Sequence, residues 1–126
     1  MSIILNQQII LIILMIYNFI IPIEYELTNP NPSDGIYVFK DDNDQIIKLN
    51  VIKDSSKSVE EVNTELNPMD EVINIYTIGN KTGYYNANSE GGVISSFIFA
   101  SGNDVIIVKC SNFDIVEKII SKIWNF

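Results

Sequence analysis

The sequence contains no histidine and no arginine, and its single cysteine is Cys110. Without histidine, the chain cannot build the Ser-His-Asp or Cys-His arrangements of nucleophilic catalysis, and it offers no imidazole to a metal ion. One cysteine excludes a disulfide within the chain. No segment matches a phosphate-binding loop or a dinucleotide fingerprint. These absences remove many common hydrolytic, metal-dependent and redox chemistries.

Positive charge is scarce as well. The 8 basic residues are all lysines and stand against 16 acidic residues, which gives a net charge of −8. A nucleic-acid interface is normally basic, so we expect no nucleic-acid partner. Docking on anionic lipid headgroups is disfavoured for the same reason.

The remaining titratable groups do not indicate catalysis. Most acidic residues lie in expected turns and on expected helix surfaces, where solvated carboxylates are poor acids at neutral pH. Cys110 ends an apolar strand and is interpreted as a buried, inert thiol, and Lys109 as a solvated lysine. We therefore predict that the protein is not an enzyme. We expect no catalytic, cofactor-binding or metal-ligating residue and no cofactor.

Apolar residues, in contrast, are concentrated at the N-terminus. Residues 3–23 contain 16 apolar side chains, ten of them isoleucine, and no charged side chain precedes Glu24. As a helix, this run would be about 32 Å long, close to the thickness of a bilayer's hydrocarbon core. We expect residues 1–23 to be an N-terminal membrane anchor or signal segment. Residues 3–21 would lie in the membrane, with the rest of the chain outside the cytoplasm.

Two alternatives to an uncleaved anchor stay open. A cleaved signal peptide would release a secreted protein, although the run has no basic start and no A-x-A-like site. The run could also be a buried strand or helix of the domain itself. The anchor fits best because Asn6, Gln7 and Gln8 could reach headgroups at one end. Pro22 would stop the helix at the other end.

The charged part of the chain is predicted to be one domain. Residues 24–34 contain two prolines and are interpreted as a linker, and residues 35–126 as an α+β domain. Two β-rich runs, 35–40 and 45–53, flank four turn-forming residues and predict a hairpin. A capping box that begins at Ser58 predicts a short helix, about 59–66.

The second half of the domain is predicted to be a meander and a helix. Short turns separate the remaining β-rich runs, so neighbouring strands should be antiparallel. These four strands are expected at 71–78, 83–87, 92–100 and 104–111. An amphipathic helix follows over 112–126. The predicted fold class is α+β: an antiparallel β-meander sheet with helices on its faces, in the order β-β-α-β-β-β-β-α, after an N-terminal hydrophobic helix.

Two blocks of this order resemble the PsbP-like family. Residues 35–62 show strand, acidic turn, strand and Ser-capped helix, and residues 82–123 show three meandering strands and a helix ending in VEKIISKI. The resemblance implies an α/β/α sandwich with a non-enzymatic binding or accessory role in exported or membrane-tethered proteins. The family usually begins with an extra hairpin carrying Tyr-Pro and Trp, which we do not find before Gly35. No site residue is carried over.

Three short segments are candidates for binding or modification. The turn Asp41-Asp42-Asn43-Asp44 offers oxygen ligands to Ca²⁺ but lacks EF-hand spacing, and a solvated turn is the simpler interpretation. Tyr84 and Tyr85, with Asn86 and Asn88, form an aromatic, amide-rich segment that suits a sugar or peptide, unless one tyrosine packs in the core. Asn80-Lys81-Thr82 is a glycosylation sequon in a predicted turn.

These observations lead to one expected function and two alternatives. We expect a non-enzymatic, membrane-tethered accessory or interaction domain whose partner is an envelope protein. A binding or sensing domain for a small ligand (a sugar, a peptide or Ca²⁺) is the first alternative. An enzyme of a type that leaves no motif is the second.

Overall fold

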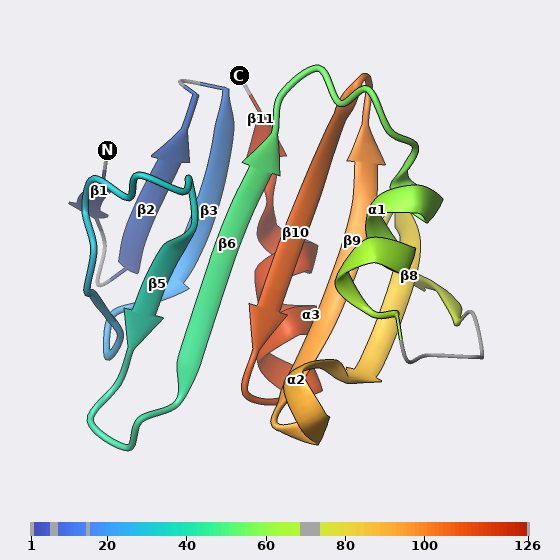
Figure 1. The fold of residues 1–126 in the computed structure, drawn as a ribbon. Coiled ribbons are helices and arrows are strands. Elements are labelled where there is room, and N and C mark those ends of the chain that lie inside the picture. Colours follow the sequence, from blue (N-terminus) through green and yellow to red (C-terminus); the bar gives the residue numbers. More distant parts are fainter. Residues whose placement is uncertain (1, 6–7, 15, 69–73, 126) are drawn as a thin grey trace.

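The computed structural model describes residues 2–5, 8–14, 16–68 and 74–125, which form two antiparallel sheets and three helices (Figure 1). The large sheet has seven strands in the order β4-β5-β6-β10-β9-β8-β7. They are β4 (Glu26–Leu27), β5 (Tyr37–Lys40), β6 (Ile46–Ile52), β7 (Ile75–Ile78), β8 (Lys81–Asn88), β9 (Ile94–Ser101) and β10 (Asp104–Cys110). The small sheet has the order β1-β2-β3-β11. Its strands are β1 (Ser2–Leu5), β2 (Gln8–Ile13), β3 (Tyr17–Pro22) and β11 (Trp124–Asn125).

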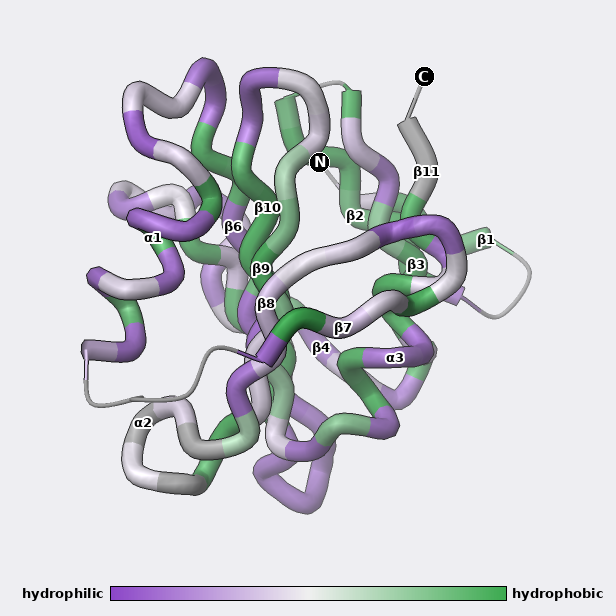
Figure 2. The backbone as a smooth tube through the Cα atoms, turned by 90° about the vertical axis from the view of Figure 1, so that its right-hand side faces the viewer, coloured by the Kyte–Doolittle hydropathy of each residue, from purple (hydrophilic) through white to green (hydrophobic). Residues whose placement is uncertain are grey.

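The main core lies between the large sheet and a layer made of helix α3 (Phe113–Lys122) and the small sheet. Alternate residues of β9 and β10, such as Phe97 and Ile106, point into it. The inward side chains of the small sheet meet them, and Phe19 of β3 is fully buried. Figure 2 shows the apolar character of β2, β3, β9 and β10. This core binds the N-terminal strands to the rest of the molecule.

A smaller core lies on the opposite face of the large sheet, under helix α1 (Val59–Leu66). Val62 of α1 packs there with Ile98, Val105 and Ile107. The α1 helix contacts β8 and β9. A helix is about 10 Å across and strands are about 4.8 Å apart, so one helix covers about two strands. The same face of β5 and β6 therefore lacks a covering helix among the described residues.

The prediction of an N-terminal helix is wrong, because the apolar run forms strands β1, β2 and β3. Isoleucine is β-branched and favours strands over helices. The inward residues alternate along each strand: Leu11 faces Phe19 in the β2–β3 register, and Ile9 faces Ile21. The length of an apolar run does not by itself distinguish a helix from two strands buried on one face. The alternative in which this run belongs to the domain is the one that the structure shows.

The predicted membrane anchor depended on that N-terminal helix. Within the described part of the chain, no helix combines the length and the apolar character needed to cross a membrane. The predicted helical membrane anchor at residues 3–21 is therefore wrong, and the membrane-anchored, extracytoplasmic location that depended on it has lost its support.

The predicted arrangement of layers around the sheet is also wrong. A helix on each face of one sheet was expected, whereas one face is shared by α3 and a second sheet. Before Gly35, β2 and β3 pair with each other, although these strands carry neither the Tyr-Pro nor the Trp of the family's hairpin. From β5 onward the elements follow the expected order with two additions: the short helix α2 (Ser89–Gly92) lies between β8 and β9, and the short strand β11 follows α3. Residues 71–73 of the expected third strand lie outside the described residues.

The ends of the elements follow local side-chain chemistry. Ser58 and Glu61 form the predicted capping box of α1: the Ser58 hydroxyl accepts a hydrogen bond from the Glu61 N–H at 3.1 Å. Asn112 caps α3 by accepting a hydrogen bond from the Ile115 N–H at 3.1 Å, and the helix ends at Lys122, earlier than predicted. In the expected linker, Asn29 bonds the backbone of Ile36 and Val38, both at 2.7 Å. That segment is therefore tied to β5.

Candidate functional site

The outer edge of the small sheet is one candidate surface. Strand β1 pairs with β2 on one side, and no described strand pairs with its other side. All four residues of β1 are exposed, and Ile3, Ile4 and Leu5 keep 43%, 71% and 54% of their surface accessible. An edge strand presents unpaired backbone N–H and C=O groups that another strand can join. We call β1 with these three side chains the apolar edge.

A groove beside α1 is the second candidate surface. Its inner part has a volume of about 220 Å³ and lies over β5, β6 and β10. Lys48, Asn50 and Lys109 supply polar groups, and Asp34 supplies a carboxylate. The apolar part of the lining is Ile36, Val38, Leu49, Leu66 and Ile107. A second hollow of about 450 Å³ shares Asn50, Leu66 and Ile107 with the first and extends the groove toward Lys53 and Lys57.

The register of the large sheet explains why two lysines meet in this groove. Lys48 of β6 lies directly opposite Lys109 of β10, and Val38 of β5 lies opposite Lys48. Residues at opposite positions of antiparallel strands share one face of the sheet. On the other side of Lys109, the same row continues through Ser96 of β9 to Asn86 of β8. The row passes from the groove to the space under α1.

A buried polar network fixes α1 above this row. Asn86 donates a hydrogen bond to Asn63 Oδ1 at 2.7 Å, and Asn67 Nδ2 lies 3.3 Å from the same oxygen. The Ser89 hydroxyl bonds both Asn67 and Ser96 at 2.9 Å. All five side chains are buried, and none titrates near neutral pH. The network therefore positions α1 and offers no general acid or base.

The acidic turn is organised by its own first residue. Asp41 Oδ1 accepts hydrogen bonds from the Asn43 and Gln45 N–H groups, both at 2.9 Å. Asp44 adopts a positive φ of 59°, a conformation that Asp tolerates in turns. Within the described ranges, no three His, Cys, Asp or Glu side chains come together as a possible metal site. One oxygen of the Asp41 carboxylate is therefore engaged in hydrogen bonds within the turn.

The tyrosine and asparagine segment is split between the two faces of β8. Tyr85 packs against Phe113 of α3 with the two rings tilted, their centroids 4.5 Å apart. Tyr84 and the buried Asn86 are two residues apart on β8 and face the α1 side of the sheet, where Asn86 bonds Asn63 of α1. The structure therefore does not gather these side chains into one surface. The side chain of Asn88 lies outside the described residues.

Three further predicted residues have definite positions. Cys110 is fully buried, and burial raises the pKa of its thiol, so a reactive thiolate is strongly disfavoured. Lys109 is half-buried in the groove rather than fully solvated. Asn80 is exposed in the two-residue turn between β7 and β8, and its glycosylation stays a prediction.

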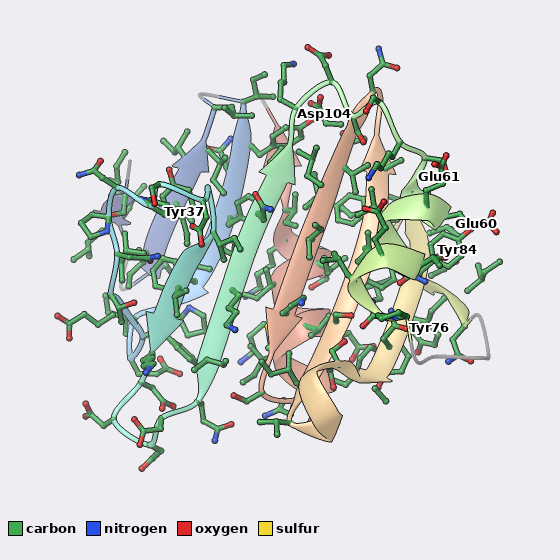
Figure 3. All side chains as sticks on the ribbon, in the orientation of Figure 1. Tyr37, Glu60, Glu61, Tyr76, Tyr84 and Asp104 are labelled. Atoms are coloured by element: carbon green, nitrogen blue, oxygen red, sulfur yellow. The ribbon has the colours of Figure 1, made fainter. Side chains whose placement is uncertain are left out.

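One charged cluster was not predicted from the sequence. The Asp104 carboxylate is almost fully buried and accepts hydrogen bonds from the Tyr17 hydroxyl and from the Asp54 N–H, the latter at 2.9 Å. Lys53 Nζ lies 3.7 Å from it. These contacts, the Tyr17 bond above all, lower the pKa of Asp104, while burial and the same bond raise the pKa of Tyr17. Figure 3 shows Asp104 at the end of the β9–β10 hairpin. The cluster joins three segments, and its Lys53 and Asp54 also line the second hollow of the groove.

Comparisons with known proteins establish the fold alone. No family model matches this chain, and no curated protein matches it. A crystal structure of a protein from Bacteroides thetaiotaomicron is similar, with a TM-score of 0.64 and 14% sequence identity. The match covers 87% of this chain but 45% of the other, so the chain spans less than half of that protein's length.

Proposed function

We propose that the protein is a non-enzymatic interaction domain that associates with a second copy of itself through the apolar edge. The observation that carries the proposal is the exposure of Ile3, Ile4 and Leu5 on a strand with one open side. A non-enzymatic binding role is also what the resemblance to PsbP-like domains implies. The membrane is no longer part of the proposed role.

Charge favours a second copy as the occupant of this edge. The chain has a net charge of −8, so two copies repel each other at most orientations. No charged side chain precedes Glu24, so the strands of the N-terminal segment present the region where identical molecules approach with the least repulsion. Two β1 strands related by a twofold axis would run antiparallel and pair their free backbone groups.

The chemistry of the described residues supports a role without catalysis. Asp104 is engaged by Tyr17, Asp54 and Lys53, and burial raises the pKa of the Cys110 thiol. The buried Asn and Ser side chains under α1 bond one another. These arrangements place Asp104 and the buried Asn and Ser side chains against structural partners, and burial disfavours a reactive thiolate at Cys110.

The oligomeric state of the full chain tests the proposal. We expect light scattering coupled to size-exclusion chromatography to show a dimer. The Ile4→Lys variant should be monomeric, because it places a charged lysine from each copy at the edge that the two strands would share. Ile75→Lys is the matched control, since Ile75 is 67% exposed on β7, the edge strand of the other sheet, and this variant should stay dimeric.

Two results would overturn the proposal. One is a wild-type chain that stays monomeric at every accessible concentration. The other is a dimer that Ile75→Lys dissociates and Ile4→Lys leaves intact, which would place the interface at β7. Circular dichroism of each variant distinguishes dissociation from unfolding.

A further inference from the structure

We propose that the open edge of β7 binds an extended basic peptide as an added outer strand, with a basic side chain of the peptide against Tyr76 and an apolar side chain against Ile75. We call residues 74–78 with these two side chains the β7 edge. The β7 edge belongs to the large sheet and the apolar edge to the small sheet, so each proposal can fail without the other.

The hydrogen-bond register shows which backbone groups of β7 face outward. β7 is the last strand of the large sheet, and no described strand pairs with its other side. The Tyr85 N–H donates to the Asn74 carbonyl at 2.8 Å, and hydrogen-bonded pairs alternate with non-bonded pairs along antiparallel strands. Ile75 and Thr77 are therefore in non-bonded positions, and their N–H and C=O groups point to the open edge. An extended peptide can pair with these groups as a further strand.

Both faces of the β7 edge offer side chains to such a peptide. Ile75 and Tyr76 keep 67% and 43% of their surface accessible and point to opposite faces of the sheet. On the α3 side, the ring centroid of Tyr76 lies 5.5 Å from that of Phe113 and 6.1 Å from that of Tyr85. These three rings form an aromatic cluster beside the open backbone groups. A peptide residue opposite Tyr76 would occupy a non-bonded pair, the position at which antiparallel strands bring side chains closest.

Charge indicates the kind of peptide. The chain has a net charge of −8, and no charged side chain lies between Asn74 and Asn80. Glu117 is exposed one helical turn after Phe113, on the same side of α3, so its carboxylate is a neighbour of the aromatic cluster. An arginine or lysine over the ring of Tyr76 can interact favourably with both the ring and this carboxylate. A basic residue opposite Tyr76 therefore suits the site.

The same charges disfavour a second copy at this edge. Pairing of two β7 strands would bring together two chains of charge −8, with a Glu117 from each copy near the shared edge. The apolar edge differs, because no charged side chain precedes Glu24. Lys81 follows the turn at the other end of β7, and its amine donates a hydrogen bond to Asn80 Oδ1 at 3.1 Å. The basic residue of the peptide thus fits better opposite Tyr76 than near Lys81.

Titration followed by nuclear magnetic resonance of the backbone amides tests the proposal with three blocked peptides. Acetyl-TVRVT-amide should bind and slow the hydrogen exchange of the Ile75 and Thr77 amides, which the added strand would pair. Acetyl-TVEVT-amide should bind at least about tenfold more weakly, because its carboxylate approaches an acidic protein beside Glu117. Acetyl-TVRPT-amide should bind about fivefold more weakly, because proline removes one backbone donor.

Three results with these peptides would overturn the proposal. One is the absence of binding by the arginine peptide at millimolar concentration. Equal binding of the arginine and glutamate peptides would overturn the choice of a basic peptide. Undiminished binding of the proline peptide would overturn the addition of a strand.

Variants at the two sheet edges locate the site. Ile75→Lys should weaken binding of the arginine peptide at least about fivefold, because it places a like charge at the β7 edge. Ile4→Lys changes the apolar edge and should leave peptide binding unchanged. This pattern is the reverse of the one expected for the dimer, so the two proposals are tested separately.

A second pair of variants tests the role of the carboxylate. Glu117→Gln should weaken binding of the arginine peptide by about twofold to fivefold, the loss expected for an exposed ion pair. Glu26→Gln removes the same charge from β4, at the far edge of the same sheet, and should leave binding unchanged. Undiminished binding in both Ile75→Lys and Glu117→Gln, or equal losses in the two controls, would overturn the proposal. Circular dichroism shows whether each variant is folded.

Discussion

Asp104 connects three segments that are far apart in the sequence. Its carboxylate accepts hydrogen bonds from Tyr17 at the start of β3 and from the Asp54 N–H after β6. Asp54 has a positive φ of 48°, which is uncommon for a residue other than glycine, and the bond from its N–H helps to hold that turn. A buried carboxylate is tolerated when it is hydrogen-bonded and paired in this way.

The lowered pKa of Asp104 makes a prediction about acid stability. A depressed folded-state pKa stabilises the fold above the ordinary carboxyl value of 3.8, and this contribution disappears as the pH falls through the folded-state pKa. At neutral pH, Asp104→Asn should have a free energy of unfolding about 1.5–3 kcal/mol below that of the wild type. On acidification, the free energy of unfolding of this variant should fall less than that of the wild type. Urea unfolding at several pH values measures both. Asp114→Asn, at an exposed position, is the control. If the stability of Asp104→Asn falls with pH as steeply as that of the wild type, Asp104 is not responsible for the loss of stability in acid.

Residue-level patterns explain why some site residues were predictable and others were not. Ser58 and Glu61 interact across three positions of one helix, so their spacing revealed the capping box. Lys48 and Lys109 come together because β6 pairs with β10, and these strands are far apart in the sequence. Asp104 meets Tyr17 across 87 positions. Local patterns do not contain such pairings.

At the scale of elements, α3 is amphipathic enough to be recognised from its sequence. Val116, Ile119 and Ile120 are fully buried against the large sheet, whereas Lys118 is exposed. The β-strands of the N-terminal run were missed because hydrophobicity dominated their pattern. Both the outward and the inward residues there are largely isoleucine, so the alternation that marks a half-buried strand is absent from the sequence.

The burial of α3 predicts its response to charge. Ile119→Asp or Ile120→Asp should unfold the protein, because each places an unpaired carboxylate in the core of a domain with about 5–15 kcal/mol of stability. Lys118→Asp changes the exposed side of the same helix and should cost little. Thermal unfolding followed by circular dichroism compares the three variants. An unchanged melting temperature in both isoleucine variants would mean that α3 does not pack on the sheet.

At the scale of the whole molecule, the two ends of the described chain meet in one sheet. β11 pairs with β3, so Trp124 and Asn125 lie beside Asn18 and Tyr17. The core that the small sheet shares with the large one includes Phe39, Ile47 and Leu49, all fully buried. The uncharged N-terminal segment thus has two sides with different roles: an inner face that completes the core, and an edge that we propose for association.

The inner face of the small sheet makes the strongest test of this architecture. Phe19 is fully buried between the sheets, so Phe19→Ala should lower the free energy of unfolding by about 3–5 kcal/mol. Ile20 is the neighbouring residue, points to the other face of β3 and is half-buried, so Ile20→Ala should cost less. Urea unfolding of the wild type and both variants, followed by circular dichroism, gives the two differences. A segment independent of the domain would leave the unfolding of the remaining chain unchanged in either variant. A large loss for Phe19→Ala within a single transition instead requires that the N-terminal strands fold together with the large sheet.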